Sequence, residues 1–260
     1  MDLKLKDKLI IVTGGSSGIG LGISTVLANE GAIPFIVGRN QDTIKQTVSK
    51  IKNGGGNAGF AIAELTKPLQ CKQAVKKAID DFGKIEGLVN NAGVNDSIGL
   101  ESGNHKDFLA SIDRNLTHYY LMAHHALPAL KKSKGSIVNI GSKTSMTGQG
   151  KTSGYAAANG GRNALTREWA VELLPYQIRV NAVIVAECYT PLYEKWANSF
   201  SDPKQKLNDI KSKIPLENRM TTSEEIANMV AFLLSEKSSH TTGQLIFVDG
   251  GYTHLDRALS

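Results

Sequence analysis

Short apolar runs alternate with longer stretches of helical apolar spacing from one end of the chain to the other. The runs predict strands, and the stretches predict helices. The predicted strands span residues 9–13, 34–37, 58–63, 87–90, 135–140, 178–184 and 245–248, and the predicted helices span residues 19–30, 42–52, 69–82, 108–130, 153–174 and 223–234. Because each strand is apolar throughout, both faces of the sheet must be covered, as in parallel sheets. The pattern predicts a Rossmann-like α/β fold, in which helices cover both faces of a doubly wound, seven-stranded parallel sheet.

One domain accounts for residues 1–260, because the chain has no internal repeat and no linker rich in Pro or Ser. Its length is ordinary for a single α/β domain. The polar segment at about residues 187–215 joins the sixth strand to the last predicted helix. We expect it to be a substrate loop, and a solvated connection is the alternative.

Composition excludes several other classes of protein. The formal net charge of +6 is spread along the chain, so we expect no nucleic acid as a partner. Apolar stretches are far shorter than the ~20 residues of a membrane span, and the first residues do not resemble a signal peptide. We therefore expect a cytoplasmic protein. The two cysteines are too few for a disulfide framework, and no residues have the spacing of a metal site.

A glycine-rich turn lies between the first strand and the first helix, at residues 13–20. Its glycines permit a tight turn and a close approach to a pyrophosphate, which the amide groups of the following helix can bind. The second strand ends at Gly38 and Arg39, where an acidic residue would bind the ribose of NAD. Since Arg39 can pair with a 2′-phosphate, we expect NADP, with NAD as the alternative. Arg39 could also simply cap a surface strand.

Together with further motifs, this turn makes the chain resemble the short-chain dehydrogenase/reductase family over essentially its full length. The motifs are residues 13–20 and 90–93, Asn115, Ser142, Tyr155 and residues 179–181. The resemblance implies that Asn115, Ser142 and Tyr155 are catalytic. It also implies a homotetramer, built partly on the helices that contain Asn115 and Tyr155. The cofactor residues that follow from the turn and the resemblance are Gly14, Ser16, Ser17, Gly18, Ile19, Arg39, Leu65, Asn91, Gly93, Tyr155, Asn159 and Thr190.

The chemistry of these residues suits hydride transfer. Oxidation of a secondary alcohol needs a base that takes the hydroxyl proton as hydride leaves the same carbon for a nicotinamide. Ionised Tyr155 can be that base while Ser142 holds the substrate oxygen. Since tyrosine in water ionises near pH ~10, a positive charge must lie close by.

Two positions depart from the family pattern. Asn159 stands where the family has lysine, one helical turn after Tyr155, and it carries no charge. We expect reduced activity near neutral pH unless Lys143 or Lys151, the nearest lysines in sequence, replaces the charge. The alternative is an impaired relative that only binds dinucleotide. The second departure is at residues 185–186, where the family has Pro-Gly; Glu187 follows.

The loops after the later strands are rich in polar side chains. Residues 91–96, 142–144, 147–150, 186–193 and 250–257 are similar to the L-fucose dehydrogenase group of this family. We expect a hydroxyl-rich substrate, a sugar such as L-fucose, because a steroid or a long acyl chain would favour apolar loops. A 3-oxoacyl or hydroxysteroid-type reductase is the alternative. The predicted substrate residues are Asn95, Lys143, Gln149, Glu187, Tyr193 and Trp196. For Glu187, a structural ion pair is the alternative.

Overall fold

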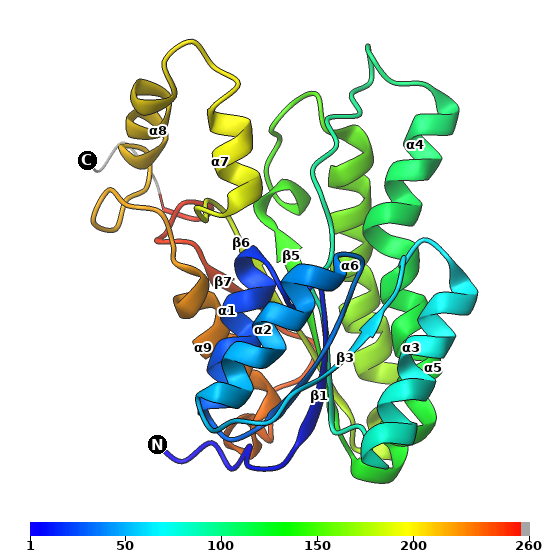
Figure 1. The fold of residues 1–260 in the computed structure, drawn as a ribbon. Helices are drawn as coiled ribbons and strands as arrows, with labels where there is room; N and C mark the ends of the chain where they lie inside the picture. The colour runs from blue at the N-terminus through cyan, green and yellow to red at the C-terminus, as the bar shows by residue number, and fades with distance from the viewer. Residues whose placement is uncertain (256–260) are drawn as a thin grey trace.

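The computed structural model describes residues 1–255 and is built on one sheet of seven parallel strands (Figure 1). The strands are β1 (Leu9–Thr13), β2 (Ile33–Gly38), β3 (Gly59–Ile62), β4 (Gly87–Asn90), β5 (Ser136–Ser142), β6 (Arg179–Val185) and β7 (Leu245–Val248). Their order in the sheet is β3-β2-β1-β4-β5-β6-β7, and every neighbouring pair is parallel. The predicted doubly wound fold is confirmed.

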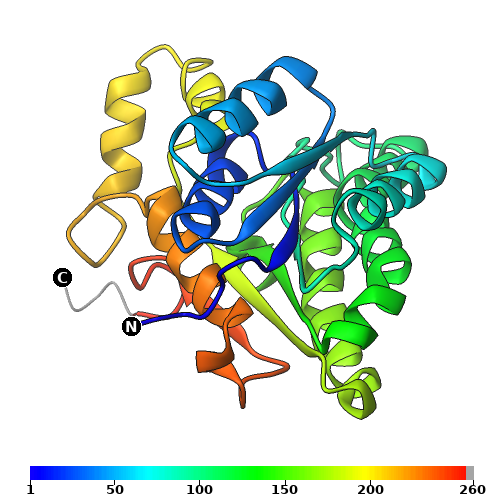
Figure 2. The same ribbon diagram turned by 60° about the horizontal axis from the view of Figure 1, so that its bottom comes forward.

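Helices cover both faces of the sheet (Figures 1 and 2). The α-helices are α1 (Gly18–Asn29), α2 (Gln41–Asn53), α3 (Pro68–Phe82), α4 (His105–Ile112), α5 (His118–Ser133), α6 (Ser153–Glu172), α7 (Pro191–Ala197), α8 (Pro203–Lys211) and α9 (Ser223–Leu234). Shorter helical turns are η1 (Asp113–Thr117), η2 (Lys143–Ser145), η3 (Leu174–Tyr176) and η4 (Glu236–Ser238). Leu9 and Ile11 of β1 pack with α3, α5 and α6, whereas Ile10 and Val12 pack with α1 and α9. The strand reads as continuously apolar because both of its faces are buried.

The carboxyl ends of the strands lie at one edge of the sheet, below α4, α7 and α8 in the view of Figure 1. β1 ends at Thr13 and β4 ends at Asn90, while Ser142 at the end of β5 pairs with Val185 at the end of β6. The segments that follow these ends carry most of the predicted site residues. Parallel topology therefore brings them to the same edge, where open α/β sheets bind ligands.

Two segments differ from the sequence prediction. The single helix predicted for residues 108–130 is interrupted by the π-helical turn η1, which contains Asn115. Here the Asn115 side chain accepts a hydrogen bond from the Val94 amide at 2.8 Å and donates one to the Ser111 carbonyl at 3.1 Å. The predicted loop at 187–215 contains α7 and α8, which begin at the caps Thr190 and Asp202. Within residues 1–255, no helix is long and apolar enough to cross a membrane.

Candidate active site

The glycine-rich turn has the backbone that close approach to a ligand requires. Gly14 has φ of +66°, which disfavours other residues, and a Cβ on Gly20 would overlap the Gly14 carbonyl. Ser17 precedes α1 in an extended conformation, and in the described structure no side chain caps this helix. The first amide groups of α1 are thus left to bind an anion such as a pyrophosphate.

Two other segments lie against this turn. Asn91 donates from its side chain to the Thr13 carbonyl at 2.9 Å, and its amide donates to the Thr13 hydroxyl at 2.8 Å. A Cβ on Gly18 would lie 3.2 Å from the Thr190 side chain. The structure therefore brings Asn91 and Thr190 to the turn, and their predicted contacts with the cofactor stay predictions.

Arg39 lies at the end of β2 with an exposed side chain, and its Nη1 is 3.2 Å from Glu64 Oε2. Burial raises the pKa of the Glu64 carboxyl, but hydrogen bonds from Thr66 and Arg39 outweigh it and hold the pKa below its usual value. A 2′-phosphate on the cofactor would share Arg39 with this carboxylate. Leu65, the neighbouring predicted cofactor residue, is buried.

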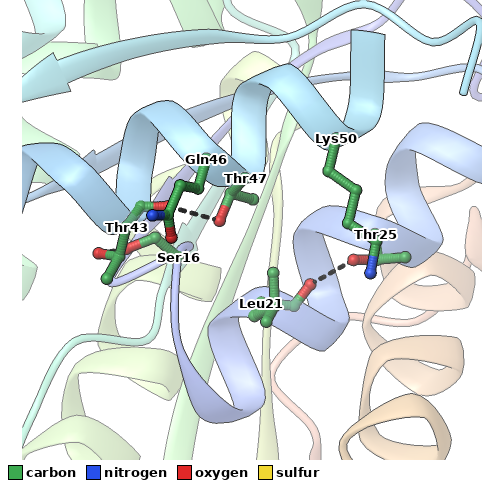
Figure 3. A pocket seen from close by; sticks show the side chains of 7 residues that line it. All are labelled: Ser16, Leu21, Thr25, Thr43, Gln46, Thr47 and Lys50. Atoms are coloured by element: carbon green, nitrogen blue, oxygen red, sulfur yellow. Dashed lines mark hydrogen bonds between the residues drawn. The ribbon is translucent and has the colours of Figure 1, made fainter. Parts of the chain in front are cut away.

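A cavity of about 290 Å³ adjoins the turn between α1 and α2 (Figure 3). It is lined by Ser16, Leu21, Thr25, Thr43, Gln46, Thr47 and Lys50. Ser16 is the predicted cofactor residue that reaches it, and Asn115, Ser142 and Tyr155 lie elsewhere. The cavity is continuous with the turn but not with the predicted catalytic residues.

The predicted catalytic residues come from three elements. Ser142 ends β5 and caps η2, with its hydroxyl accepting hydrogen bonds from the Thr144 amide at 3.3 Å and the Thr144 hydroxyl at 3.1 Å. Tyr155 lies in the first turn of α6, which packs against η2. Asn115 is fully buried in η1, and η1 also packs against α6.

Asn159 does not present a free amide to the site. It is completely buried, and its Nδ2 donates to the Tyr155 carbonyl at 2.9 Å. Its Oδ1 accepts from Arg162 Nη1 at 3.0 Å. Both polar ends of the side chain have a partner within the protein, so the predicted ribose contact is left to the second N–H of Nδ2 or the second lone pair of Oδ1.

Arg162 is a neighbour of the predicted catalytic residues that the sequence did not suggest. The side chain is buried, its Nε donates to the Asn115 carbonyl at 2.8 Å, and its Nη1 donates to the Ile140 carbonyl at 3.2 Å. The guanidinium carbon is 5.9 Å from the centre of the Tyr155 ring. Arg162 is therefore a cation close to Tyr155 in addition to the lysines that the sequence suggests. A signal was present, because positions 155 and 162 are two turns apart on the same helical face.

Lys143 and Glu187 form a buried ion pair between the ends of β5 and β6. The Tyr193 hydroxyl donates to the other Glu187 oxygen at 2.7 Å, and burial together with the Glu187 charge raises the Tyr193 pKa. Lys143 Nζ also lies 4.1 Å from the centre of the Tyr252 ring. Glu187 thus forms the ion pair weighed as its alternative role, and Lys143 is neutralised by it.

The remaining predicted substrate residues, Asn95, Gln149 and Trp196, are exposed. Trp196 packs edge-on against Tyr193, with ring centres 5.2 Å apart. Asn95 accepts a hydrogen bond from the Ser97 amide at 3.2 Å, and Gln149 lies on the exposed segment after η2. Lys151 is exposed on the same segment.

Known proteins are similar to this chain over nearly its whole length. A family model described as enoyl-(acyl carrier protein) reductase matches residues 14–253. The 3-oxoacyl-[acyl-carrier-protein] reductase of Chlamydia pneumoniae is 36% identical over 98% of this chain and 100% of its own. The chain belongs to the short-chain dehydrogenase/reductase family.

Two solved members of this family have the same fold. The Cj0485 dehydrogenase is 46% identical, with 100% and 99% of the two chains covered and a TM-score of 0.95. The aldohexose dehydrogenase of Thermoplasma acidophilum is 30% identical over 97% and 96%, with a TM-score of 0.87.

As a short-chain dehydrogenase/reductase, the protein is an oxidoreductase whose family uses NAD or NADP. The residues present fit such a cofactor, since the amides that begin α1 are uncapped in the described structure and Thr190 lies against Gly18. Residues 1–255 contain no group of three or more His, Cys, Asp or Glu side chains that could hold a metal ion.

Proposed function

We propose that the protein transfers hydride between a nicotinamide and a secondary alcohol of a hydroxyl-rich small molecule, a sugar such as L-fucose. The observation that carries this proposal is the buried Lys143–Glu187 pair, extended by the Tyr193 hydroxyl, at the ends of β5 and β6. A sugar can exchange hydrogen bonds with these groups, whereas an acyl chain would leave charged groups desolvated without new partners. The similarity to an aldohexose dehydrogenase supports the same substrate class.

Tyr155 is the acid/base of the proposed reaction. The bound nicotinamide supplies the site that accepts or donates the hydride. In the oxidative direction the alcohol O–H bond would break with its proton passing to the Tyr155 phenolate, the C–H bonding pair would leave as hydride for the oxidised nicotinamide, and the carbonyl C=O bond would form. The Ser142 hydroxyl holds the substrate oxygen during this step. The amides that begin α1 would bind the pyrophosphate, and Thr190 would hold the carboxamide.

We further propose NADP as the preferred dinucleotide and a homotetramer in the cytoplasm. Arg39 is the basic residue that supports the first choice. Phe108, Leu109 and Tyr120 on α4 and α5 are large exposed hydrophobic residues that support a subunit interface there. The thiols of Cys71 and Cys188 are free and suit a reducing compartment.

A substrate panel tests this proposal. Nicotinamide absorbance is followed with NAD and NADP against L-fucose, other aldohexoses, a simple cyclic alcohol and, in reverse, a short 3-oxoacyl thioester. We expect turnover of a sugar, and its loss in Tyr155→Phe with little change in cofactor affinity. Reduction of the thioester alone would instead place the protein with its acyl-carrier-protein reductase relatives. Cofactor binding without turnover of any compound would indicate a dinucleotide-binding subunit.

A further inference from the structure

We propose that Arg162 supplies the positive charge that stabilises the Tyr155 phenolate, in place of the lysine that the family has at position 159. Arg162 is a positioning residue in this proposal, because it acts on Tyr155 and not on the substrate. The inference rests on the proposed acid/base role of Tyr155.

The helix places the two side chains together. Tyr155 and Arg162 are two turns apart on α6, and the guanidinium carbon lies 5.9 Å from the Tyr155 ring centre. On its other side the guanidinium covers the Tyr119 ring at 4.3 Å. Arg162 is held at this place by the Asn115 carbonyl, the Ile140 carbonyl and the Asn159 side chain. Asn159 carries no charge, but it helps to hold the charged Arg162 side chain in place.

The charge of Arg162 is not neutralised by a partner. Its hydrogen-bond acceptors are two carbonyls and an amide oxygen, and no carboxylate of residues 1–255 lies within ion-pair distance. An arginine stays protonated in proteins, so a full positive charge remains in a low-dielectric region. This charge changes the pKa of the ionisable groups close to Arg162.

The charge of Arg162 changes the pKa of two side chains on α5, His118 and Tyr119. Burial, and after it the charge of Arg162, lowers the pKa of His118 to about 3, so this imidazole is neutral at physiological pH. Burial raises the pKa of Tyr119 to about 12, although Arg162 opposes the change. At the ends of β5 and β6, Lys143 and Glu187 neutralise each other. Among these groups, Arg162 alone contributes a net charge beside Tyr155 at neutral pH.

A purely structural role is the competing explanation, since Arg162 also joins α6 to the π-helical turn at Asn115. The two roles differ in their dependence on pH. Loss of a structural tether lowers the rate by a similar factor at every pH. Loss of the charge lowers the rate by a smaller factor as pH rises, because hydroxide then ionises Tyr155 without help from Arg162.

The direct test is a tyrosinate titration by ultraviolet difference absorbance, which needs no substrate. The signal of Tyr155 is isolated by subtracting the matching Tyr155→Phe variant in each background. Taking the 5.9 Å between the guanidinium carbon and the ring centre as the separation of the charges, a unit charge at an effective dielectric of about 20–40 shifts an ionisation midpoint by about 1–2 pH units. We expect an upward shift of this size in Arg162→Gln and a midpoint near that of the parent in Arg162→Lys. Arg167→Gln, an exposed arginine of the same helix, is the matched control and should leave it unchanged.

Circular dichroism establishes that each variant is folded before its midpoint is compared. If Arg162→Gln does not fold, Arg162→Met, whose unbranched side chain fills the same space, replaces it. An unchanged midpoint in the folded neutral variant overturns the proposal. Once a substrate is found, the parent should exceed Arg162→Gln by roughly 10- to 100-fold near neutral pH, and the ratio should approach one near pH ~10. A constant ratio would favour the tether. Full turnover in Tyr155→Phe would reject the proposed role of Tyr155, and the titration would still measure the charge.

Discussion

His118 should make this protein sensitive to acid. It is the first residue of α5 and is 1% exposed; its Nε2 lies 3.1 Å from the Arg114 carbonyl, to which it donates in the neutral form. Its Nδ1 has no hydrogen-bond partner in the described structure. Burial, followed by the charge of Arg162, lowers the pKa of His118 from 6.5 to about 3. The folded state therefore resists protonation of this imidazole.

The direction of the effect follows from proton binding. Between pH 6.5 and pH 3 an unfolded chain binds a proton at residue 118 that the folded chain does not bind. Acid thus favours unfolding, and the free energy of unfolding falls as pH drops through this window. Each pH unit inside the window corresponds to about 1.4 kcal/mol. From pH ~7 to pH ~5 the loss that comes from His118 is therefore about 2 kcal/mol.

The assay is urea unfolding of the parent and His118→Gln at these two pH values. Glutamine can still donate to the Arg114 carbonyl but does not titrate. We expect the parent to lose about 2 kcal/mol more than the variant between pH ~7 and pH ~5. His105→Gln, at the exposed start of α4, is the control and should behave like the parent. Equal losses in the parent and His118→Gln would refute the reasoning.

Two further predictions concern the cofactor and position 159. Arg39→Ala should weaken NADP binding by roughly 10-fold and NAD binding much less, since an exposed charge pair with a phosphate contributes about 1–2 kcal/mol; calorimetry with both dinucleotides measures this, and equal losses would show that Arg39 does not read the phosphate. Asn159→Lys would place a second cation beside Arg162, so the free energy of unfolding should fall by about 2–4 kcal/mol with no gain in turnover. Urea unfolding and initial rates measure these effects, and a tenfold faster variant would contradict them.

The sheet could be predicted from the sequence because its signal is repeated at every strand. Leu9 and Ile10 point to opposite faces, and both faces are packed, so the run is apolar without alternation. The π-helical turn at Asn115 could not be predicted in this way, since its hydrogen bonds depend on the distant Val94 amide. α7 did carry a local signal, a Thr190 cap followed by Pro191, which the polar composition of the segment obscured.

The sequence could suggest single residues beside the glycine-rich turn, but it could not show which charged side chains form pairs. Asn91 and Thr190 lie against the glycine-rich turn. The partnership of Lys143 with Glu187 joins the ends of two strands, 44 residues apart, and sequence spacing does not reveal it. Because Lys143 is paired with Glu187, the unpaired cation near Tyr155 is Arg162, which lies two turns further along α6.

The charge of Arg162 is difficult to explain as structure alone. Its bonds to the Asn115 and Ile140 carbonyls and to Asn159 could be made by a neutral amide donor or by water. Burying a cation without a carboxylate costs several kcal/mol even after local relaxation, which a neutral donor would avoid. The same charge also contributes to the low pKa of His118, and so to the acid sensitivity predicted above. A tether explains the hydrogen bonds but not the charge, whereas stabilisation of the Tyr155 phenolate requires the charge and needs the hydrogen bonds to hold it in place.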